Sequence, residues 1–81
     1  MDIAKEIYDY IVDTFTIEAD EDFTADVNLF DYGYVDSLDA MKIVTELEAR
    51  FGIEITQRDL VLYPMHTINE LAAVVAAKLG A

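Results

Sequence analysis

The stretch from Asp36 to Asp39 reads Asp-Ser-Leu-Asp and places a serine hydroxyl between carboxylates. The acid-to-acid spacing is that of a capping box, so it predicts that a helix begins here. The first turn of a helix offers free backbone N–H groups and the positive end of the helix dipole, both of which stabilise an attached phosphate. Met41, one turn later, adds an adaptable apolar contact of the kind used at partner surfaces. Capping explains Asp36 but not a reachable Ser37 beside Met41, so we expect another protein to act on Ser37.

A catalytic role for Ser37 would need a base, and His66 is the only histidine in the chain. One serine and one histidine do not make a triad, and the Gly-x-Ser-x-Gly elbow of hydrolases is absent. A chain of 81 residues is also small for enclosing a pocket that excludes water. We therefore expect no enzymatic activity and no catalytic residue, and we interpret His66 as a loop residue beside Pro64 and the Thr67 cap.

The acidic segment from Asp20 to Asp31 partly matches a calcium-binding EF-hand loop. The matching positions are Asp20, Asp22, Thr24, Asp26 and Asn28. Ala25 replaces the glycine that the sharp turn needs, and Asp31 replaces the bidentate glutamate. Gly33 follows where the exiting helix should already continue, and the chain has no second loop of this kind. We expect no metal site here, and an acidic EF-hand-like calcium-binding interaction module remains the alternative from another class.

The composition limits the partners of the chain. A net charge of −12 disfavours binding to nucleic acid or to anionic lipid and favours partners with basic patches. Residues 1–39 have a net charge of −11, whereas residues 40–81 have a net charge of only −1. The absence of cysteine excludes disulfides and thiolate metal sites. We expect a monomeric cytosolic chain that is complete from Met1 to Ala81 and does not insert into a membrane.

Three apolar patterns with helical spacing predict the main helices. The first main helix begins at a cap on Asp2. The second begins at Asp36 and ends at Gly52, and the last begins at the Thr67 cap and ends at Gly80. Their predicted core residues are Ile3, Ile7, Ile11 and Phe15; Ala40, Ile43, Val44, Leu47 and Phe51; and Ile68, Leu71, Ala72, Val75 and Leu79.

The connections complete a small all-α four-helix bundle, with three main helices and a short third helix. The short helix is predicted from a Thr56 cap to Leu62, ahead of Pro64. The residues 53–55 before it form an extended linker with two apolar anchors. Residues 16–35 form a long connection, for which we expect apolar anchors at Val27, Leu29 and Phe30; so long a loop is usually functional or well packed.

The segment Leu29-Phe-Asp-Tyr-Gly-Tyr-Val-Asp-Ser-Leu38 is followed by Ile43-Val44, Leu47-Glu48 and Phe51-Gly-Ile-Glu-Ile55. These motifs resemble the acyl carrier proteins and peptidyl carrier domains that bind phosphopantetheine. The resemblance covers nearly the whole chain, from the first helix to the helix after Thr67. Asp-Ser-Leu alone is a weak signal, but it is specific when joined to the other motifs and to this length. The resemblance implies an acyl-carrier-type bundle and a single carrier domain over residues 1–81.

The resemblance also implies a function. A phosphopantetheinyl transferase would move 4'-phosphopantetheine from coenzyme A to the Ser37 hydroxyl, while Asp36 would help to orient the magnesium of the transferase and the diphosphate. The terminal thiol of the arm would hold an acyl or aminoacyl group as a thioester, which a chain without cysteine cannot do by itself. Leu38, Met41 and Thr45, with the neighbouring Lys42, would form a docking face. The enzymes that dock would be an adenylating or acyl-loading enzyme and downstream synthase enzymes.

The helix after Ser37 departs from the pattern of fatty-acid carriers. Those carriers usually read Gly-x-Asp-Ser-Leu before a strongly acidic helix, whereas Gly33 lies one position earlier here and residues 37–51 have a net charge of −1. This difference favours a freestanding carrier of polyketide or nonribosomal-peptide biosynthesis. A D-alanyl carrier protein, which usually has Asp-Ser-Met where Leu38 stands here, and a fatty-acid acyl carrier protein remain alternatives. The cargo is not identified by the sequence.

Overall fold

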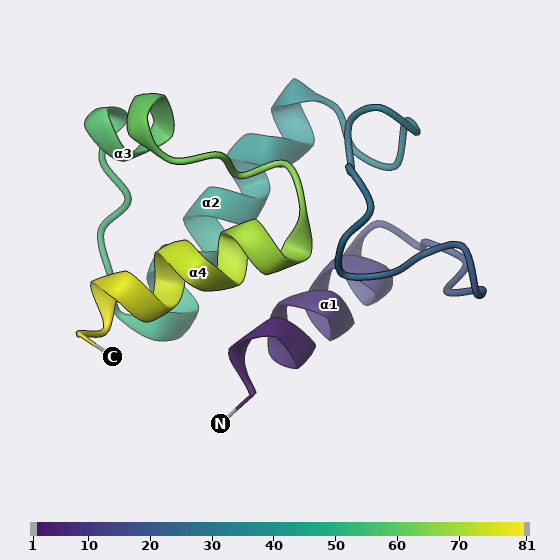
Figure 1. The fold of residues 1–81 in the computed structure, drawn as a ribbon, viewed down its shortest axis with the longest axis horizontal. Coiled ribbons are helices and arrows are strands. Elements are labelled where there is room, and N and C mark those ends of the chain that lie inside the picture. Colours follow the sequence, from purple (N-terminus) through teal and green to yellow (C-terminus); the bar gives the residue numbers. More distant parts are fainter. Residues whose placement is uncertain (1, 81) are drawn as a thin grey trace.

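A computed structural model describes residues 2–80 of the chain, so Met1 and Ala81, the expected ends, lie outside the described residues. Within this range the chain forms four helices and no strand (Figure 1). The helices are α1 (Ile3–Thr14), α2 (Ser37–Phe51), α3 (Gln57–Leu62) and α4 (Ile68–Lys78). The predicted all-α architecture, with three main helices and a short third helix, is confirmed.

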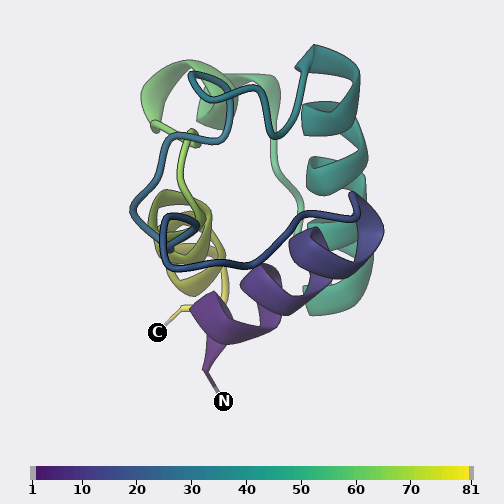
Figure 2. The same cartoon turned by 90° about the vertical axis from the view of Figure 1, so that its right-hand side faces the viewer.

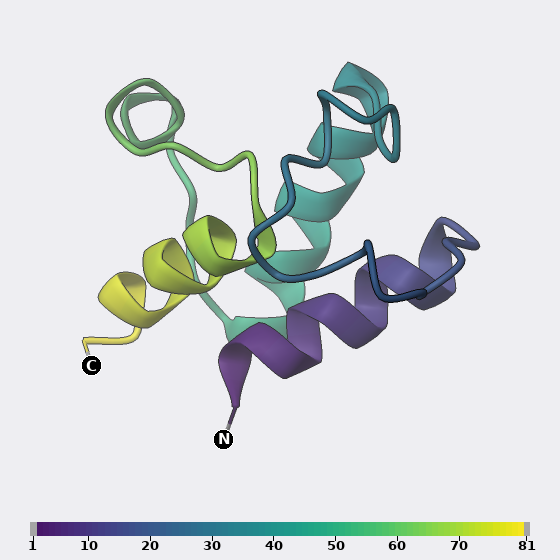
Figure 3. The same ribbon diagram turned by 45° about the vertical axis from the view of Figure 1, so that its right-hand side comes forward.

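Helices α1 and α4 pack against each other, and α2 lies alongside them (Figure 1). The start of α1 and the end of α4 lie at one end of the molecule in every view (Figures 2 and 3). The first turn of α2 and the whole of α3 lie at the opposite end (Figures 1, 2 and 3). Within residues 2–80, no helix combines the length and apolar content that a membrane span requires.

Each helix begins at the side chain that the sequence predicts. The side chain of Asp2 accepts a hydrogen bond from the backbone N–H of Lys5, and full capping boxes start α2 at Asp36, α3 at Thr56 and α4 at Thr67. Gly52 ends α2 in the left-handed conformation, with φ 64° and ψ 40°, which costs a residue without a Cβ little. These starts and stops follow from hydrogen bonds between near neighbours in the chain, so the local sequence determines them.

The apolar side chains inside the bundle form one core. The largest fully buried side chains are Ile7, Ile11, Leu29, Leu47, Ile68 and Val75. Burying one such side chain contributes about 1.5–3 kcal/mol, and these residues come from three helices and the long connection. The prediction for Leu79 was wrong: α4 ends at Lys78, so Leu79 is 41% exposed at the cap. Val74 is buried instead.

The long connection between α1 and α2 is packed onto the core rather than held away from it. Leu29 is buried as predicted, and its N–H donates to the carbonyl oxygen of His66 at 2.8 Å. Phe23 and Val35 are also buried, whereas the predicted anchors Val27 and Phe30 are half-buried. The Phe23 ring lies 5.3 Å from the ring of Tyr8 and 4.8 Å from that of Tyr34. A single aromatic residue in an acidic run has no periodicity, which is why the sequence did not predict its burial.

Candidate functional site

The side chain of Ser37 is exposed at the first position of α2. Its neighbours provide the cap: the Asp39 N–H donates to Asp36 Oδ1 at 2.9 Å, and the Asp36 N–H donates to Asp39 Oδ2 at 3.1 Å. Because two carboxylates complete this box, the Ser37 hydroxyl is not needed for capping and has no hydrogen-bond partner among residues 2–80. The hydroxyl is therefore accessible, and the capping box sets the position of the backbone that carries it.

The backbone around Ser37 suits an anionic group. The Ala40 N–H donates to the carbonyl oxygen of Asp36 at 2.9 Å and closes the first turn, while the N–H groups of Ser37 and Leu38 have no partner in the described part of the chain. Free N–H groups at the start of a 15-residue helix lie at the positive end of its dipole. A phosphate ester on Ser37 would meet these donors.

The four predicted docking residues are all exposed on α2. Leu38 is 73% exposed and Met41 is 55% exposed, and Lys42 and Thr45 are exposed as well. The Thr45 hydroxyl donates to the carbonyl oxygen of Met41 at 2.9 Å, so it is already satisfied within the helix. A shallow depression is lined by Met41, Lys42, Thr45, Glu46 and Ala49. Three of the predicted residues thus share one depression, and Leu38 lies outside its lining.

The two cations of α2 have different surroundings. Arg50 Nε lies 3.0 Å from Glu46 Oε2, and the guanidinium lies 5.0 Å from the centre of the Tyr10 ring, so Arg50 joins α2 to α1. Lys42 forms no ion pair with any carboxylate among the described residues. Of the two positive charges that distinguish this helix in the sequence, only that of Lys42 is free to meet a partner.

A cavity of about 460 Å³ lies between α2, α3 and the segment that joins α3 to α4. Its lining is mainly apolar: Leu29, Phe30, Ala40, Ile43, Val44, Leu60, Val61, Leu62, Tyr63, Pro64, Met65, His66 and Leu71. Ala40 is one turn from Ser37 along α2, so the cavity begins close to the exposed hydroxyl.

The apolar residues at the end of α3 and at its C-cap had no predicted role. Leu60, Val61, Leu62 and Tyr63 are all exposed to solvent and also line the cavity. The available signal was the unbroken apolar run from Leu60 to Tyr63, because a helix of six residues cannot bury apolar side chains on every side.

In the acidic connection, side-chain oxygens accept hydrogen bonds from backbone N–H groups of the same segment. Asn28 Oδ1 accepts from the N–H groups of Phe30 and Asp31, and Asp20 Oδ1 accepts from the Asp22 N–H. These are the oxygens that an EF-hand loop would direct at a cation. Over residues 2–80, no group of three or more histidine, cysteine, aspartate or glutamate side chains comes together in a geometry that could hold a metal ion.

His66 takes part in the packing of its loop. Its N–H donates to Glu70 Oε1 at 2.8 Å, and its ring meets the Phe30 ring edge-on with the centres 5.7 Å apart. These contacts agree with the interpretation of His66 as a loop residue next to the α4 cap.

Residues 2–80 form a small four-helix bundle with an accessible serine hydroxyl at the start of α2. The family model described as the phosphopantetheine attachment site matches residues 5–75, so the chain belongs to this family. It is a carrier protein with covalently attached 4'-phosphopantetheine. Such carriers generally act with phosphopantetheinyl transferases and synthase enzymes and are generally not catalytic themselves. No solved structure matches the chain significantly.

Proposed function

We propose that Ser37 is the attachment residue and that residues 1–81 act as one carrier domain, which holds acyl or aminoacyl groups as thioesters and delivers them to partner enzymes. The main support is that Ser37 is the only serine in the chain and has an exposed hydroxyl that the helix cap does not use. When attached, the arm supplies a thiol, which a chain without cysteine lacks. Its flexible tether raises the effective concentration of the cargo at each enzyme.

The residues around Ser37 have separate roles in this proposal. The capping box of Asp36 and Asp39 holds the start of α2, and with it the direction of the Ser37 hydroxyl. The free N–H groups of Ser37 and Leu38 stabilise the charge of the phosphodiester. One oxygen of the Asp36 carboxylate accepts the cap hydrogen bond, which leaves the other for the magnesium of the transferase.

Intact-mass measurement after incubation with coenzyme A and a promiscuous phosphopantetheinyl transferase tests the attachment. We expect a gain of about 340 Da, the mass of the phosphopantetheine group, in the unsubstituted protein and none in Ser37→Ala. Ser37→Ala should fold, because Ser37 takes no part in the cap and alanine favours helix. Thr14→Ala, which removes an exposed hydroxyl from the end of α1, is the control and should gain the same mass as the parent. Mass gain in Ser37→Ala would refute the assignment.

We further propose that the partners belong to polyketide or nonribosomal-peptide biosynthesis rather than to fatty-acid synthesis. The support is the predicted docking face of α2: Leu38, Met41, Lys42 and Thr45 are all exposed, and the helix has a net charge of only −1. Within residues 2–80, Lys42 forms no ion pair. A partner that recognises a strongly acidic helix would find little negative charge on α2. Loading the modified protein with a panel of adenylating enzymes and with a malonyl transferase of fatty-acid synthesis would test this. Faster loading by the malonyl transferase would favour the fatty-acid alternative.

A further inference from the structure

A second cavity, of about 390 Å³, lies between α3 and α4. It is lined by Asp59, Tyr63, Pro64, Glu70, Ala73, Val74, Ala77 and Lys78. None of these residues belongs to α2, and only Tyr63 and Pro64 also line the cavity beside α2. Its volume is within the range of sites that bind small organic molecules. The second cavity is therefore a candidate binding site that is separate from the helix carrying Ser37.

Helix α4 supplies an apolar wall of this cavity. Glu70, Ala73, Val74 and Ala77 follow one another at spacings of three, one and three residues, so they lie on one face of the helix. Val74 is buried, whereas the two alanines have small side chains and are exposed to solvent. A molecule from solution can therefore reach this wall and place an apolar group against it.

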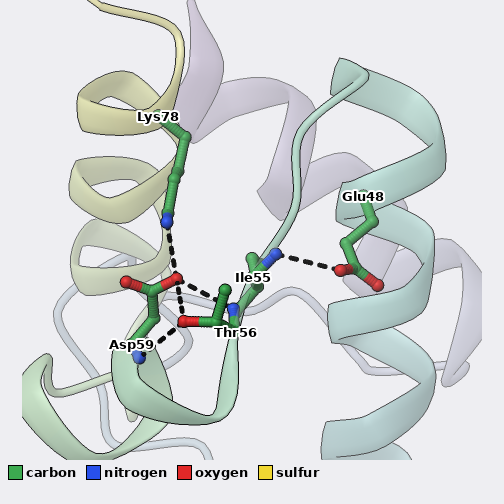
Figure 4. A network of polar contacts seen from close by, with 5 residues as sticks. All are labelled: Glu48, Ile55, Thr56, Asp59 and Lys78. Carbon is green, nitrogen blue, oxygen red and sulfur yellow. Dashed lines mark hydrogen bonds and ion pairs between the residues drawn. The ribbon is translucent and has the colours of Figure 1, made fainter.

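The Asp59 carboxylate has one oxygen in use and one free. Its Oδ2 accepts from the Thr56 N–H at 2.8 Å and from Thr56 Oγ1 at 2.9 Å, and it lies 2.6 Å from Lys78 Nζ (Figure 4). Oδ1 accepts no hydrogen bond from any residue in the range 2–80, and Figure 4 shows it pointing away from Thr56. The side chain is only 10% exposed. A largely buried carboxylate thus keeps one oxygen without a partner beside the cavity.

The Glu70 carboxylate shows the same division. Its Oε1 accepts from the N–H groups of His66 and Thr67, at 2.8 and 3.1 Å. Its Oε2 has no hydrogen-bond partner in the described part of the chain, and Glu70 forms no ion pair there. Among the lining residues, Lys78 is the only cation, and it is paired with Asp59. One negative charge at the cavity is therefore not neutralised.

We propose that this cavity binds an organic cation that consists of an ammonium group attached to an apolar body. The ammonium group donates to the free oxygens of Asp59 and Glu70, and the body lies against Ala73 and Ala77. Tyr63 adds an aromatic ring, a group that attracts cations. An anion is disfavoured by the net charge of −12. A bare metal ion lacks ligands here, because two carboxylates are fewer than hard cations require.

Benzylamine, a primary ammonium ion with a benzene ring at neutral pH, is the probe. When the isotope-labelled full chain is titrated and followed by NMR, we expect the amide signals of Glu70, Ala73, Val74 and Ala77 to shift until they saturate. Benzyl alcohol, which has the same ring without the charge, should bind roughly tenfold more weakly or less, because hydrogen bonds to charged groups are the stronger ones. Equal binding of the two probes, or shifts confined to the acidic residues 18–31, would overturn the proposal.

Two variants test the charge and the space separately. Glu70→Gln keeps the cap, since glutamine retains the accepting oxygen, but it should weaken benzylamine binding roughly fivefold or more. Ala77→Leu keeps both carboxylates and favours helix, and it should weaken binding of both probes by filling the cavity. Glu54→Gln, which removes an exposed carboxylate outside the cavity, is the matched control and should bind as the parent does.

Circular dichroism of each variant checks that the helices are retained. Parent-like binding of benzylamine by Glu70→Gln or by Ala77→Leu would overturn the proposal. Equal weakening in Glu54→Gln and Glu70→Gln would also overturn it, because binding would then reflect only the overall negative charge of the chain.

Discussion

Helices α2 and α3 both begin at a capping box, yet they are attached to the molecule in opposite ways. The inner face of α2 carries Ile43, Val44 and Leu47, which are all buried in the core. In α3 the buried residue is Asp59, and the apolar side chains face solvent or a cavity. Helix α2 is thus held by apolar packing, whereas α3 is joined to α4 by the ion pair between Asp59 Oδ2 and Lys78 Nζ, which lie 2.6 Å apart. The candidate attachment residue thus lies on the helix that is packed into the core, and α3 forms a wall of the adjacent cavity.

The sharpest test of this contrast is a pair of leucine truncations. Leu47→Ala should lower the free energy of unfolding by about 2–5 kcal/mol, because it leaves a cavity in the core. Leu62→Ala in α3 should change it by no more than about 0.5 kcal/mol, because that side chain is exposed. Urea unfolding followed by circular dichroism measures both, and similar losses for the two variants would contradict the contrast.

Substitutions of Asp36 separate its capping role from its charge. Asp36→Ala should destabilise the protein by about 1 kcal/mol, whereas Asp36→Asn should be nearly neutral because asparagine caps equally well. If the carboxylate also serves the transferase, both variants should be modified more slowly than the parent. A normal modification rate for Asp36→Asn would restrict this residue to its structural role.

The pH dependence of stability reports on the ion pair between Asp59 and Lys78. Lys78, followed by the Thr56 N–H, lowers the pKa of Asp59 from 3.8 to about 2. A carboxyl whose pKa falls on folding stabilises the folded state above its unfolded pKa, and this contribution is lost as the pH falls through the folded pKa. The stability difference between the parent and Lys78→Met should therefore be largest above pH 3.8 and shrink toward pH 2. Chemical unfolding at several pH values measures it, and a constant difference would argue against the pair.

The smallest expected effect on stability is that of Lys42→Glu on α2. Lys42 is exposed and unpaired among the described residues, so the change should alter the free energy of unfolding by less than about 0.5 kcal/mol. The loading rate should change more, because the reversed charge faces the partner. Arg58→Glu, an exposed charge reversal on α3, is the comparison. Equal loading rates for the parent and Lys42→Glu would remove Lys42 from the docking face.

Much of this molecule could be predicted from patterns within a few residues. The starts of all four helices, the stop at Gly52 and most of the core stripes agree with the structure. The exposure of Ser37 also agrees, because Asp36 and Asp39 provide the cap locally. Predictions were weaker where no periodicity exists: Phe23 and Val35 in the long connection are buried, and the apolar run of α3 is exposed.

The sequence by itself determined where the helices begin, because each cap is a hydrogen bond between residues three positions apart. It also determined that one serine lies at such a start without serving as the cap. Only the tertiary structure decided that Lys78 meets Asp59, that α3 borders an apolar cavity and that Leu79 lies outside the core. These contacts join residues far apart in the chain, so they depend on how the helices pack and where each one ends.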